Sequence, residues 1–559
     1  MKKIIAGVLA LTLVCGFIPF NNNITDKYTV YAQGETVEYT EGTYGVLNYK
    51  NFGDYIEISN CDVSAIEVEI PSEIDGVAVT NIGISAFGDC EALTSVTIPE
   101  SVTSISGSAF LYCTSLASVT IPDSVTSIGG YAFGFCKNLT SVTIPDNVTD
   151  IGDCAFISCE ALTSIDVSEA NDYYSSVDGV LFNKDMTDII QYPIGKTDTD
   201  YIIPNSVTNI AVSAFEACKT LTSVTFPNGV TSIGDYAFAG WASLTSVTIP
   251  DSVTSIGWSA FHSCKSLTSV TIPDGVKSIS NAIFNSCDAL TSIDVSKTND
   301  YYSSVDGVLF NKDMTAIIQY PVGKTDTKYI IPDGVTNIGW SAFETCKTLT
   351  SVTIPDSVTN IHAFAFAGCQ SLTSITIPDS VTNIQYNTFD SCESLTSVTI
   401  PASVTNIDWS AFYSCYALTS ITIENPNCEI YASSLTISNK DDEFTGTIYG
   451  YENSTAQAYA EKYNRKFDTL ENAPTDTPTL PLGDINGNNI VDSSDASNVL
   501  AVYALVSTGK ESGLTAEQKT AADVNGDDVI DAADASLILA YYAHISTGGT
   551  GTLENYLKS

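Results

Sequence analysis

Basic side chains are scarce in this chain of 559 residues. Lysine and arginine together number 22, against 65 aspartate and glutamate residues, so the formal net charge is −43. Nucleic acids and anionic membranes both require a basic face on the protein that binds them. We therefore expect no nucleic-acid partner and no anionic membrane partner.

Histidine is rarer still, because only His262, His362 and His544 occur, and they show no common partner pattern. Ser-His-Asp and Cys-His catalysis both depend on a histidine beside a nucleophile. We therefore predict no catalytic residue and no organic cofactor. Paired carboxylates, as used in glycoside hydrolysis, stay open because acidic residues are abundant. Seven of the acids, however, occupy repeated Pro-Asp turns, where aspartate serves the turn.

Long apolar runs are absent after residue 20, so no membrane insertion of the mature chain is expected. The first run follows Lys3 and ends at Phe20, and Val30-Tyr31-Ala32 supplies a cleavage site. We interpret residues 1–32 as a signal peptide and expect the protein to be secreted. An uncleaved anchor is the alternative, because the cleavage site lies far from the apolar run.

A 23-residue repeat fills the middle of the chain. A phenylalanine, here called the marker Phe, returns at the same phase in twelve units: 87, 110, 133, 156, 215, 238, 261, 284, 343, 366, 389 and 412. Such a period predicts a solenoid, in which each unit buries its apolar face against its neighbours. Within one unit, Ser118–Ile121 alternates as a strand does, Pro122-Asp123 turns the chain, and Val125–Ile128 alternates again.

Two longer units interrupt the array and are nearly identical to each other. Residues 171–185 recur as residues 299–313. Asp178-Gly179 predicts a tight turn between two short strands, so we expect a hairpin in each long unit. Because the segment is repeated, a single active site at Asp178, Lys184 and Asp185 is disfavoured.

The unit Leu-Thr-Ser-Val-Thr-Ile-Pro-x-Ser-Val-Thr-Ser-Ile-Gly-x-x-Ala-Phe resembles the BspA-like (Treponema-type) leucine-rich repeat of bacterial surface proteins. The resemblance covers roughly residues 60–440. It implies a mainly β solenoid and a role in adhesion or in binding proteins and surfaces, although a repeat fold alone does not fix function.

Cysteines follow the repeat as well. Eleven of the fifteen stand three residues after a marker Phe, and Trp241 replaces one member of that column. A constant phase predicts a buried ladder of free thiols rather than metal ligands, which would need Cys-x2-Cys pairs. Disulfides between neighbouring coils are the alternative, since these coils lie about one strand spacing apart.

Three tryptophans share a variable position three residues before the marker Phe: Trp258, Trp340 and Trp409. Variation between units indicates that this position faces solvent. We take the three as candidate surface-binding residues that stack on sugars or anchor a protein; packing on adjacent coils is the plainer interpretation.

Two acidic loops near the C-terminus begin at Asp484 and Asp523, 39 residues apart, and each precedes an apolar helical pattern. Oxygen-bearing side chains recur at loop positions 1, 3, 5, 9 and 12, which is the pattern of a calcium loop. A Pro/Thr-rich stretch before them predicts a semi-rigid linker.

Loop-helix pairs of this kind resemble a type I-like dockerin module over about residues 482–547. The resemblance implies two calcium ions. Their ligands would be Asp484, Asn486, Asn488, Ile490 (main chain), Asp492, Asp495, Asp523, Asn525, Asp527, Val529 (main chain), Asp531 and Asp534. It further implies a cohesin module of a scaffolding protein as partner. Recognition would fall on Ser493, Ser494, Ala532 and Ala533.

We expect the following organisation: signal peptide 1–32, N-terminal cap 33–80, solenoid 81–440, C-terminal cap 441–470, linker 471–482, small all-α dockerin 483–547 and tail 548–559. The predicted function is that of a secreted, non-catalytic binding protein. It would dock onto a cohesin-bearing, cellulosome-like scaffold of a polysaccharide-degrading complex and present the solenoid to an unknown protein or polysaccharide. A cell-surface adhesin and a polysaccharide hydrolase are the alternatives.

Overall fold

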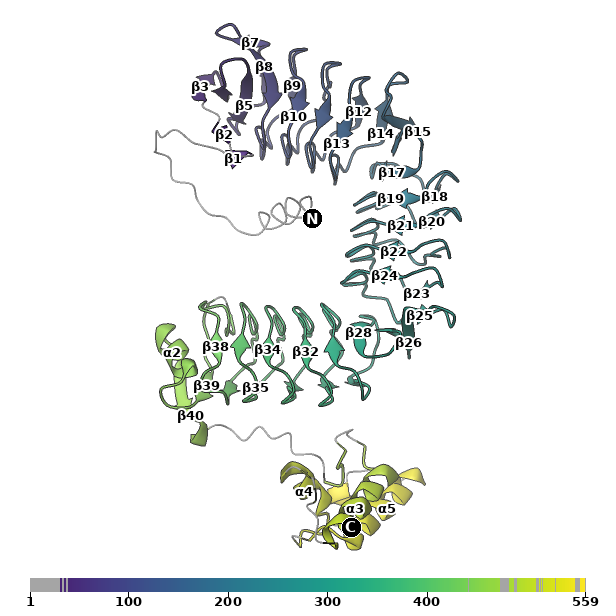
Figure 1. The fold of residues 1–559 in the computed structure, drawn as a ribbon, viewed down its shortest axis with the longest axis vertical. Coiled ribbons are helices and arrows are strands. Elements are labelled where there is room, and N and C mark those ends of the chain that lie inside the picture. The colour runs from purple at the N-terminus through teal and green to yellow at the C-terminus, as the bar shows by residue number, and fades with distance from the viewer. Residues whose placement is uncertain are drawn as a thin grey trace. The chain divides into compact units, whose positions relative to one another are not determined.

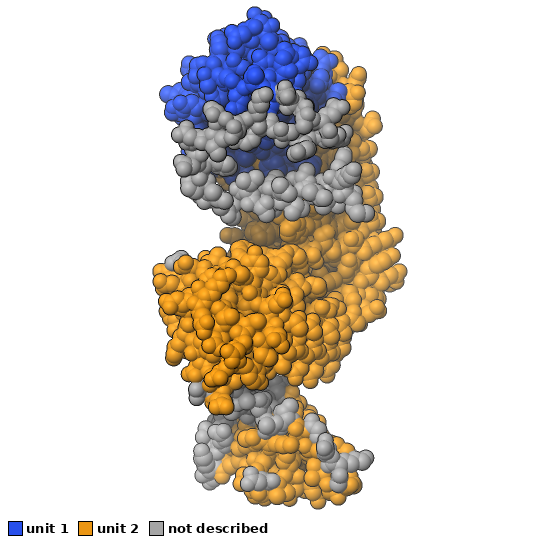
Figure 2. All heavy atoms as spheres, turned by 60° about the vertical axis from the view of Figure 1, so that its left-hand side comes forward, with its two compact units in different colours: residues 1–137, 147–155 blue, residues 138–146, 156–559 orange. Residues whose placement is uncertain are grey.

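The computed structural model describes residues 31–32, 35–36, 39–440, 442–472, 482–486, 490–508, 512, 514, 516–527, 529–547 and 553–557. Most of the predicted signal peptide and of the linker lies outside these residues. The chain divides into two compact units, residues 1–137 with 147–155 and residues 138–146 with 156–559 (Figure 2).

The coils of the repeat carry one or two short strands, which pair in parallel with the equivalent strands of neighbouring coils (Figure 1). Paired residues are one coil apart in the sequence, so that Ser127 pairs with Ser104 and Ser255 pairs with Ser232. Parallel pairing at this offset is what stacked, nearly identical coils must produce. The prediction of a mainly β solenoid is confirmed.

One column of strands is two residues long and ends in an isoleucine, which is half-buried at Ile151, Ile279 and Ile430 and buried in the other members. Its members are β10 (Ser104–Ile105), β11 (Ser127–Ile128), β13 (Asp150–Ile151), β19 (Asn209–Ile210), β21 (Ser232–Ile233), β22 (Ser255–Ile256), β24 (Ser278–Ile279), β30 (Asn337–Ile338), β32 (Asn360–Ile361), β34 (Asn383–Ile384), β36 (Asn406–Ile407) and β38 (Glu429–Ile430).

The other column is formed by the Ser-Val-Thr-Ile alternation. Its members are β6 (Glu67–Glu69), β9 (Ser95–Thr97), β12 (Ser141–Ile144), β14 (Ser164–Val167), β18 (Asp200–Ile202), β20 (Ser223–Thr225), β23 (Ser269–Ile272), β25 (Ser292–Val295), β29 (Lys328–Ile330), β31 (Ser351–Thr353), β33 (Ser374–Ile375), β35 (Ser397–Ile400), β37 (Ser420–Ile423), β39 (Thr447–Gly450) and β40 (Lys466–Thr469). Residues 118–121 bury Val119 and Ile121 as expected but form no strand, because strands of this column pair only in short runs.

Both long units contain the expected hairpin, with a third strand after it. The strands are β15 (Tyr174–Val177), β16 (Val180–Asn183) and β17 (Asp188–Gln191), then β26 (Tyr302–Val305), β27 (Val308–Asn311) and β28 (Ala316–Gln319). Asp178 and Gly179 connect the first hairpin and both have positive φ, 50° and 75°. A two-residue hairpin turn of type I′ requires that conformation at both positions, so these residues serve the turn.

The two ends of the array differ from the coils between them. Before the first coils stand β1 (Tyr31–Ala32), β2 (Glu35–Thr36), β3 (Thr40–Tyr44), β4 (Leu47–Asn51), β5 (Ile56–Cys61), β7 (Glu73–Ile74) and β8 (Val77–Ile82). After the last coil, helix α2 (Thr455–Lys462) begins at the N-cap Ser454, and the 3-10 helix η1 (Leu470–Asn472) follows β40.

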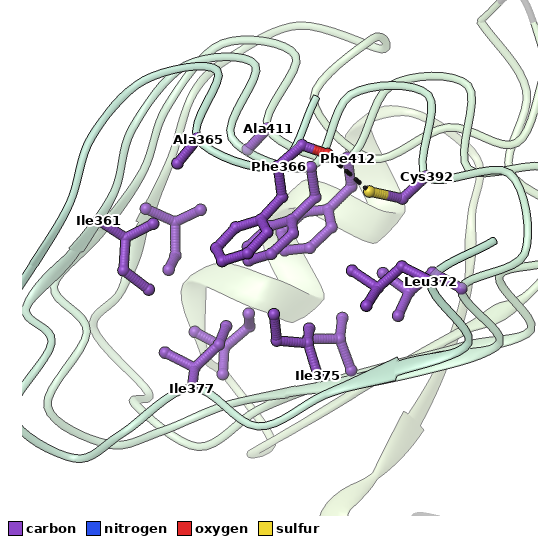
Figure 3. Packing of buried hydrophobic residues seen from close by; sticks show 14 of the residues in the cluster. Ile361, Ala365, Phe366, Leu372, Ile375, Ile377, Cys392, Ala411 and Phe412 are labelled. Atoms are coloured by element: carbon purple, nitrogen blue, oxygen red, sulfur yellow. Dashed lines mark hydrogen bonds between the residues drawn. The ribbon is translucent and has the colours of Figure 1, made fainter. Parts of the chain in front are cut away.

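The core is a ladder of marker phenylalanines (Figure 3). Phe366 and Phe389 stack with ring centroids 5.5 Å apart, and Phe389 and Phe412 with centroids 5.3 Å apart. Beside the rings runs the cysteine column, whose described members are buried and free. The Cys392 thiol donates to the Phe366 carbonyl at 3.3 Å, so the buried ladder is confirmed.

Left-handed residues flank the marker Phe although glycine is rare there. In the coil of Phe343, for example, Ser341 has φ 57° and Thr345 has φ 61°. This conformation costs an L-residue about 1–2 kcal/mol. Stacking compensates, because the Phe343 amide donates to the Ala365 carbonyl of the next coil at 2.8 Å.

The C-terminal module contains α3 (Ser493–Val506), α4 (Ala516–Ala522), α5 (Ala532–Ser546) and α6 (Leu553–Leu557). Helices α3 and α5 lie side by side around the buried Val499 and Ile538 (Figure 1). Helix α6 falls in the stretch expected to be a tail, yet its Leu553 is buried in the same core. Among the described helices, none combines the length and the apolar character needed to cross a membrane.

Candidate functional site

The first acidic loop leads directly into α3. Asp492 is the N-cap of that helix, and Asp495 reaches back to the Asp492 amide, which completes a capping box. The buried Asp495 carboxylate accepts main-chain N–H groups from Ile485 at 3.0 Å, Asn486 at 3.2 Å and Asp492 at 3.1 Å. The carboxylate at loop position 12 thus fixes the main chain at loop positions 2, 3 and 9 by hydrogen bonds.

The second loop repeats this arrangement before α5. The buried Asp534 carboxylate accepts from the amides of Val524 at 2.8 Å, Asn525 at 3.1 Å and Asp531 at 2.9 Å. In addition, Asp523 Oδ1 accepts from the amides of Gly526 and Asp527. The loop therefore curls around its own carboxylates as a cation-binding turn does.

The donor set fits a hard cation. Asp484, Asp495 and Asp534 are fully buried carboxylates in a strongly acidic chain, and burying a charge without a counter-charge is costly. Within the described residues no three His, Cys, Asp or Glu side chains form a metal cluster. The expected ligands instead mix carboxylates with amide and main-chain oxygens, and Asn488 lies outside the described residues. The twelve calcium ligands remain a prediction.

Exposed apolar side chains recur on the two dockerin-like helices with the 39-residue spacing of the loops. The two equivalent triads, here called the docking triads, are Leu500, Tyr503 and Val506 on α3 and Leu539, Tyr542 and Ile545 on α5. Each is 37 to 47% exposed, although most large apolar residues of such a module would be buried. Sequence reasoning missed these residues, but the spacing of 39 was the signal that could have found them.

The four predicted recognition residues lie at the helix starts, next to the loops. Ser493 and Ser494 open α3, Ala532 and Ala533 open α5, and all four are exposed. The Ser494 hydroxyl and amide both donate to Asp492, which holds the pKa of the Asp492 carboxyl below its usual range. The two helix starts differ chemically, because one has two serines and the other has two alanines. The two docking triads are chemically alike, since each has a tyrosine between two aliphatic residues.

The three candidate surface tryptophans divide between packing and exposure. Trp258 packs on Tyr236 of the preceding coil at 5.9 Å and remains 38% exposed. Trp340 is half-buried against Phe364 and Tyr386. Trp409 is 43% exposed. Packing on adjacent coils therefore holds for Trp258 and Trp340, and binding of a ligand by the three tryptophans remains a prediction.

A polar column that the sequence analysis missed follows the marker Phe by one residue. Glu216, His262, Asn285, Glu344 and Asp390 occupy it in five of the last eight marked coils. Burial raises the pKa of the Glu344 and Asp390 carboxyls and lowers the pKa of the His262 imidazole. The recurrence of polar residues directly after the marker Phe was the sequence signal that could have found this column.

Parallel coils with a phenylalanine spine, followed by two capped loop-helix pairs, define a leucine-rich-repeat solenoid joined to a helical loop module. A family model described as the BspA type leucine rich repeat region matches residues 59–185, 196–306 and 324–440, more than half of the chain. The chain belongs to this family. Residues 482–541 match the dockerin type I domain, so both resemblances are confirmed and the protein combines two non-catalytic kinds of module.

Solved structures of bacterial leucine-rich repeat proteins are similar to this chain. A leucine rich cell surface protein from Faecalibacterium prausnitzii is 30% identical, covering 70% of this chain and 95% of that chain, with a TM-score of 0.37. A leucine-rich repeat protein from Eubacterium ventriosum is 23% identical, covering 66% of this chain and 93% of that chain, with a TM-score of 0.36. The search of curated proteins found no match.

Proposed function

We propose that this protein is a secreted, non-catalytic binding protein that its dockerin holds on a cohesin-bearing scaffold of a polysaccharide-degrading complex. The repeat solenoid would present the recognition surface. The observation that carries the proposal is the pair of docking triads on α3 and α5, because exposed apolar patches on a small module mark partner sites.

Calcium is the expected cofactor of this docking. The loops set the N-termini of α3 and α5 through the capping boxes at Asp492 and Asp531. A cation held by the loop oxygens would fix both helix starts, and with them the predicted recognition residues. Metal binding of this kind adds to folding free energy. Cohesin binding should therefore require calcium.

A secreted location agrees with the modules, since both families are typical of extracellular or surface-associated bacterial proteins. The name of the Faecalibacterium prausnitzii protein describes it as a cell surface protein. Attachment to an extracellular scaffold is one way to hold such a solenoid outside the cell.

The test is binding of the full-length protein to immobilised type I cohesin modules, with calcium and with EGTA. We expect calcium-dependent binding. Because the two triads are equivalent, Tyr503→Asp or Tyr542→Asp alone should weaken binding only a few fold, whereas the double variant should weaken it at least about a hundredfold. Tyr416→Asp, on the solenoid and 53% exposed, is the matched control.

Absence of binding to any cohesin in calcium would overturn the docking proposal. Unchanged binding by the double variant would overturn the assignment of the docking triads.

A further inference from the structure

The last four marked coils form the longest uninterrupted run with an aromatic residue at one outward-facing part of the coil, whereas Tyr131, Tyr236 and Trp258 hold that place in three earlier coils. Between the short strand and the marker Phe the last four coils carry four aromatic residues, here called the aromatic strip: Trp340, Phe364, Tyr386 and Trp409. At the same place the coil of Phe110 has Gly107 and Ser108. Because that coil forms the same turn without an aromatic ring, the fold does not require one there.

The rings of the aromatic strip lie next to one another across successive coils. Trp340 and Phe364 have ring centroids 5.9 Å apart with planes 26° apart, and Tyr386 meets each of them edge-on at 5.5 Å. Trp409 stands one coil further, where its carbonyl accepts from the Asn387 amide at 3.1 Å. Trp409 is the most exposed of the four, and the other three are half-buried.

Polar side chains accompany the rings in the same coils. One residue or two before each of the last three rings stand His362, Gln385 and Asp408, whereas every earlier marked coil has Gly, Ser or Ala at this place. Gln385 Oε1 accepts from the Ala363 amide at 3.1 Å, and its Nε2 lies 3.5 Å from His362 Nδ1. Asp408 Oδ1 accepts from the Trp409 amide at 2.7 Å, so that carboxylate lies beside the strip.

A row of amides runs along the adjoining strands β30, β32, β34 and β36. Its members, here called the amide row, are Asn337, Asn360, Asn383 and Asn406. Asn360 Nδ2 donates to Asn337 Oδ1, and Asn406 Nδ2 donates to Asn383 Oδ1, both at 3.0 Å. Asn360 Nδ2 also donates to Thr359 Oγ1 and Asn337 Nδ2 to Thr336 Oγ1. An amide oxygen has two lone pairs, so each member keeps the capacity to accept a hydrogen bond from a ligand.

These features share one period, because ring and amide recur once per coil. A ligand that matches such a surface must itself be a repeating polymer. The apolar faces of pyranose rings stack on aromatic side chains, while the hydroxyls around the rim need planar amide and carboxylate partners. The segments that carry the strip contain Asp408 but no lysine or arginine, and the whole chain has a net charge of −43. Anionic polymers would therefore be repelled.

We infer that the aromatic strip and the amide row bind a strand of neutral polysaccharide laid along the last four coils. This inference deepens the proposed function by naming the ligand class of the solenoid, and it rests on that function only for its biological setting. Binding itself needs neither the dockerin nor a cohesin.

The test is native affinity electrophoresis of the full-length protein in EGTA, in gels that contain xyloglucan, glucomannan, mixed-linkage β-glucan or, as the anionic control, polygalacturonate. We expect at least one neutral polysaccharide to retard the protein and polygalacturonate to have no effect. Trp409→Ala should lower the apparent affinity about tenfold, as loss of one exposed aromatic contact does, and Trp340→Ala with Trp409→Ala should abolish retardation.

A matched control is available in the first unit. Tyr112 and Phe135 form another partly exposed stacked pair, at 4.6 Å, in coils that carry Ser104 and Ser127 in place of the amide row. Tyr112→Ala should leave retardation unchanged. Asn360→Ala, which leaves every ring in place, should weaken retardation and so report on the amide row independently of aromatic packing.

A readout on the unaltered protein guards against misfolded variants. Saturating polysaccharide should shift the tryptophan emission of the wild type, because Trp409 becomes covered. The inference is overturned if no neutral polysaccharide retards the wild type, if Trp409→Ala with unchanged thermal unfolding is retarded as strongly as the wild type, or if the array binds only proteins. The docking variant Tyr503→Asp with Tyr542→Asp should be retarded normally, which separates this inference from the cohesin proposal.

Discussion

Asn285 Nδ2 donates a hydrogen bond of 2.6 Å to Glu344 Oε2, although 59 residues separate them in the sequence. Asp288 and Lys347 are also 59 residues apart and form an ion pair at 3.3 Å. The second long unit therefore leaves the array as a hairpin and returns so that the coils before and after it stay neighbours. Glu160 and Lys219 bridge the first long unit in the same way, at 2.5 Å.

Replacing Glu344 by glutamine should stabilise the solenoid at neutral pH. Burial raises the pKa of Glu344 above its usual 4.5. Its contribution to stability is therefore complete below pH 4.5 and is lost as pH rises through the higher folded-state pKa. Glutamine keeps an oxygen that can accept from Asn285 and carries no charge.

We expect Glu344→Gln to raise the midpoint of thermal unfolding at pH 7 by a few degrees, roughly 2–4 °C per kcal/mol, and to bring no gain at pH 4. Glu100→Gln, at an exposed turn, is the control. An equal effect of Glu344→Gln at both pH values would refute this explanation.

Removing one ring of the phenylalanine ladder should open the solenoid locally. Phe366 is fully buried between Phe343 and Phe389. Phe366→Ala should cost about 3–5 kcal/mol, since the lost ring leaves a cavity. Phe364→Ala, two residues away and half-buried, should cost less than half as much. Hydrogen exchange of the neighbouring coils gives the measurement, because coils depend on nearest neighbours; equal effects of the two variants would contradict the ladder.

The buried thiols should resist modification until the protein unfolds. Burial raises the pKa of Cys369 to about 12 and also raises that of Cys392. The reactive thiolate is thus disfavoured as well as covered. We expect Ellman's reagent to label none of the described cysteines rapidly in the native protein and all of them in guanidinium chloride. Rapid labelling of Cys392 in the native state, read by peptide mapping, would argue against a closed ladder.

Calcium should stabilise the C-terminal module through both loops. At a free concentration a hundred times the dissociation constant, a bound ion adds about 2.7 kcal/mol. We expect isothermal titration to give two calcium ions for the wild type and one for Asp534→Asn, which lacks a carboxylate in the second loop. Asp379→Asn, at an exposed Pro-Asp turn, should still bind two. Faster hydrogen exchange of α3 and α5 in EGTA is the second expected readout, and its absence would speak against calcium as a structural ion.

The sequence predicted the solenoid, the hairpins and the buried cysteines because each repeats at a fixed phase. Phe389 keeps its place in every comparable coil and Cys392 in every one except the coil that carries Trp241, so their burial could be inferred without coordinates. Turns were harder to predict. Ser341 and Thr345 adopt left-handed conformations without glycine, because hydrogen bonds from stacked coils impose a geometry that local preference does not indicate.

The sequence by itself determined the period, the core residues and the pattern of oxygen donors in the two acidic loops, since these depend on local spacing. Only the tertiary structure decided which outward-facing side chains of different coils lie side by side. Stacking brings Trp340 next to Tyr386, 46 positions away in the numbering, and Asn285 next to Glu344 across a hairpin. Such contacts are set by how coils pack, because backbone pairing between coils fixes the neighbours of every outward-facing side chain.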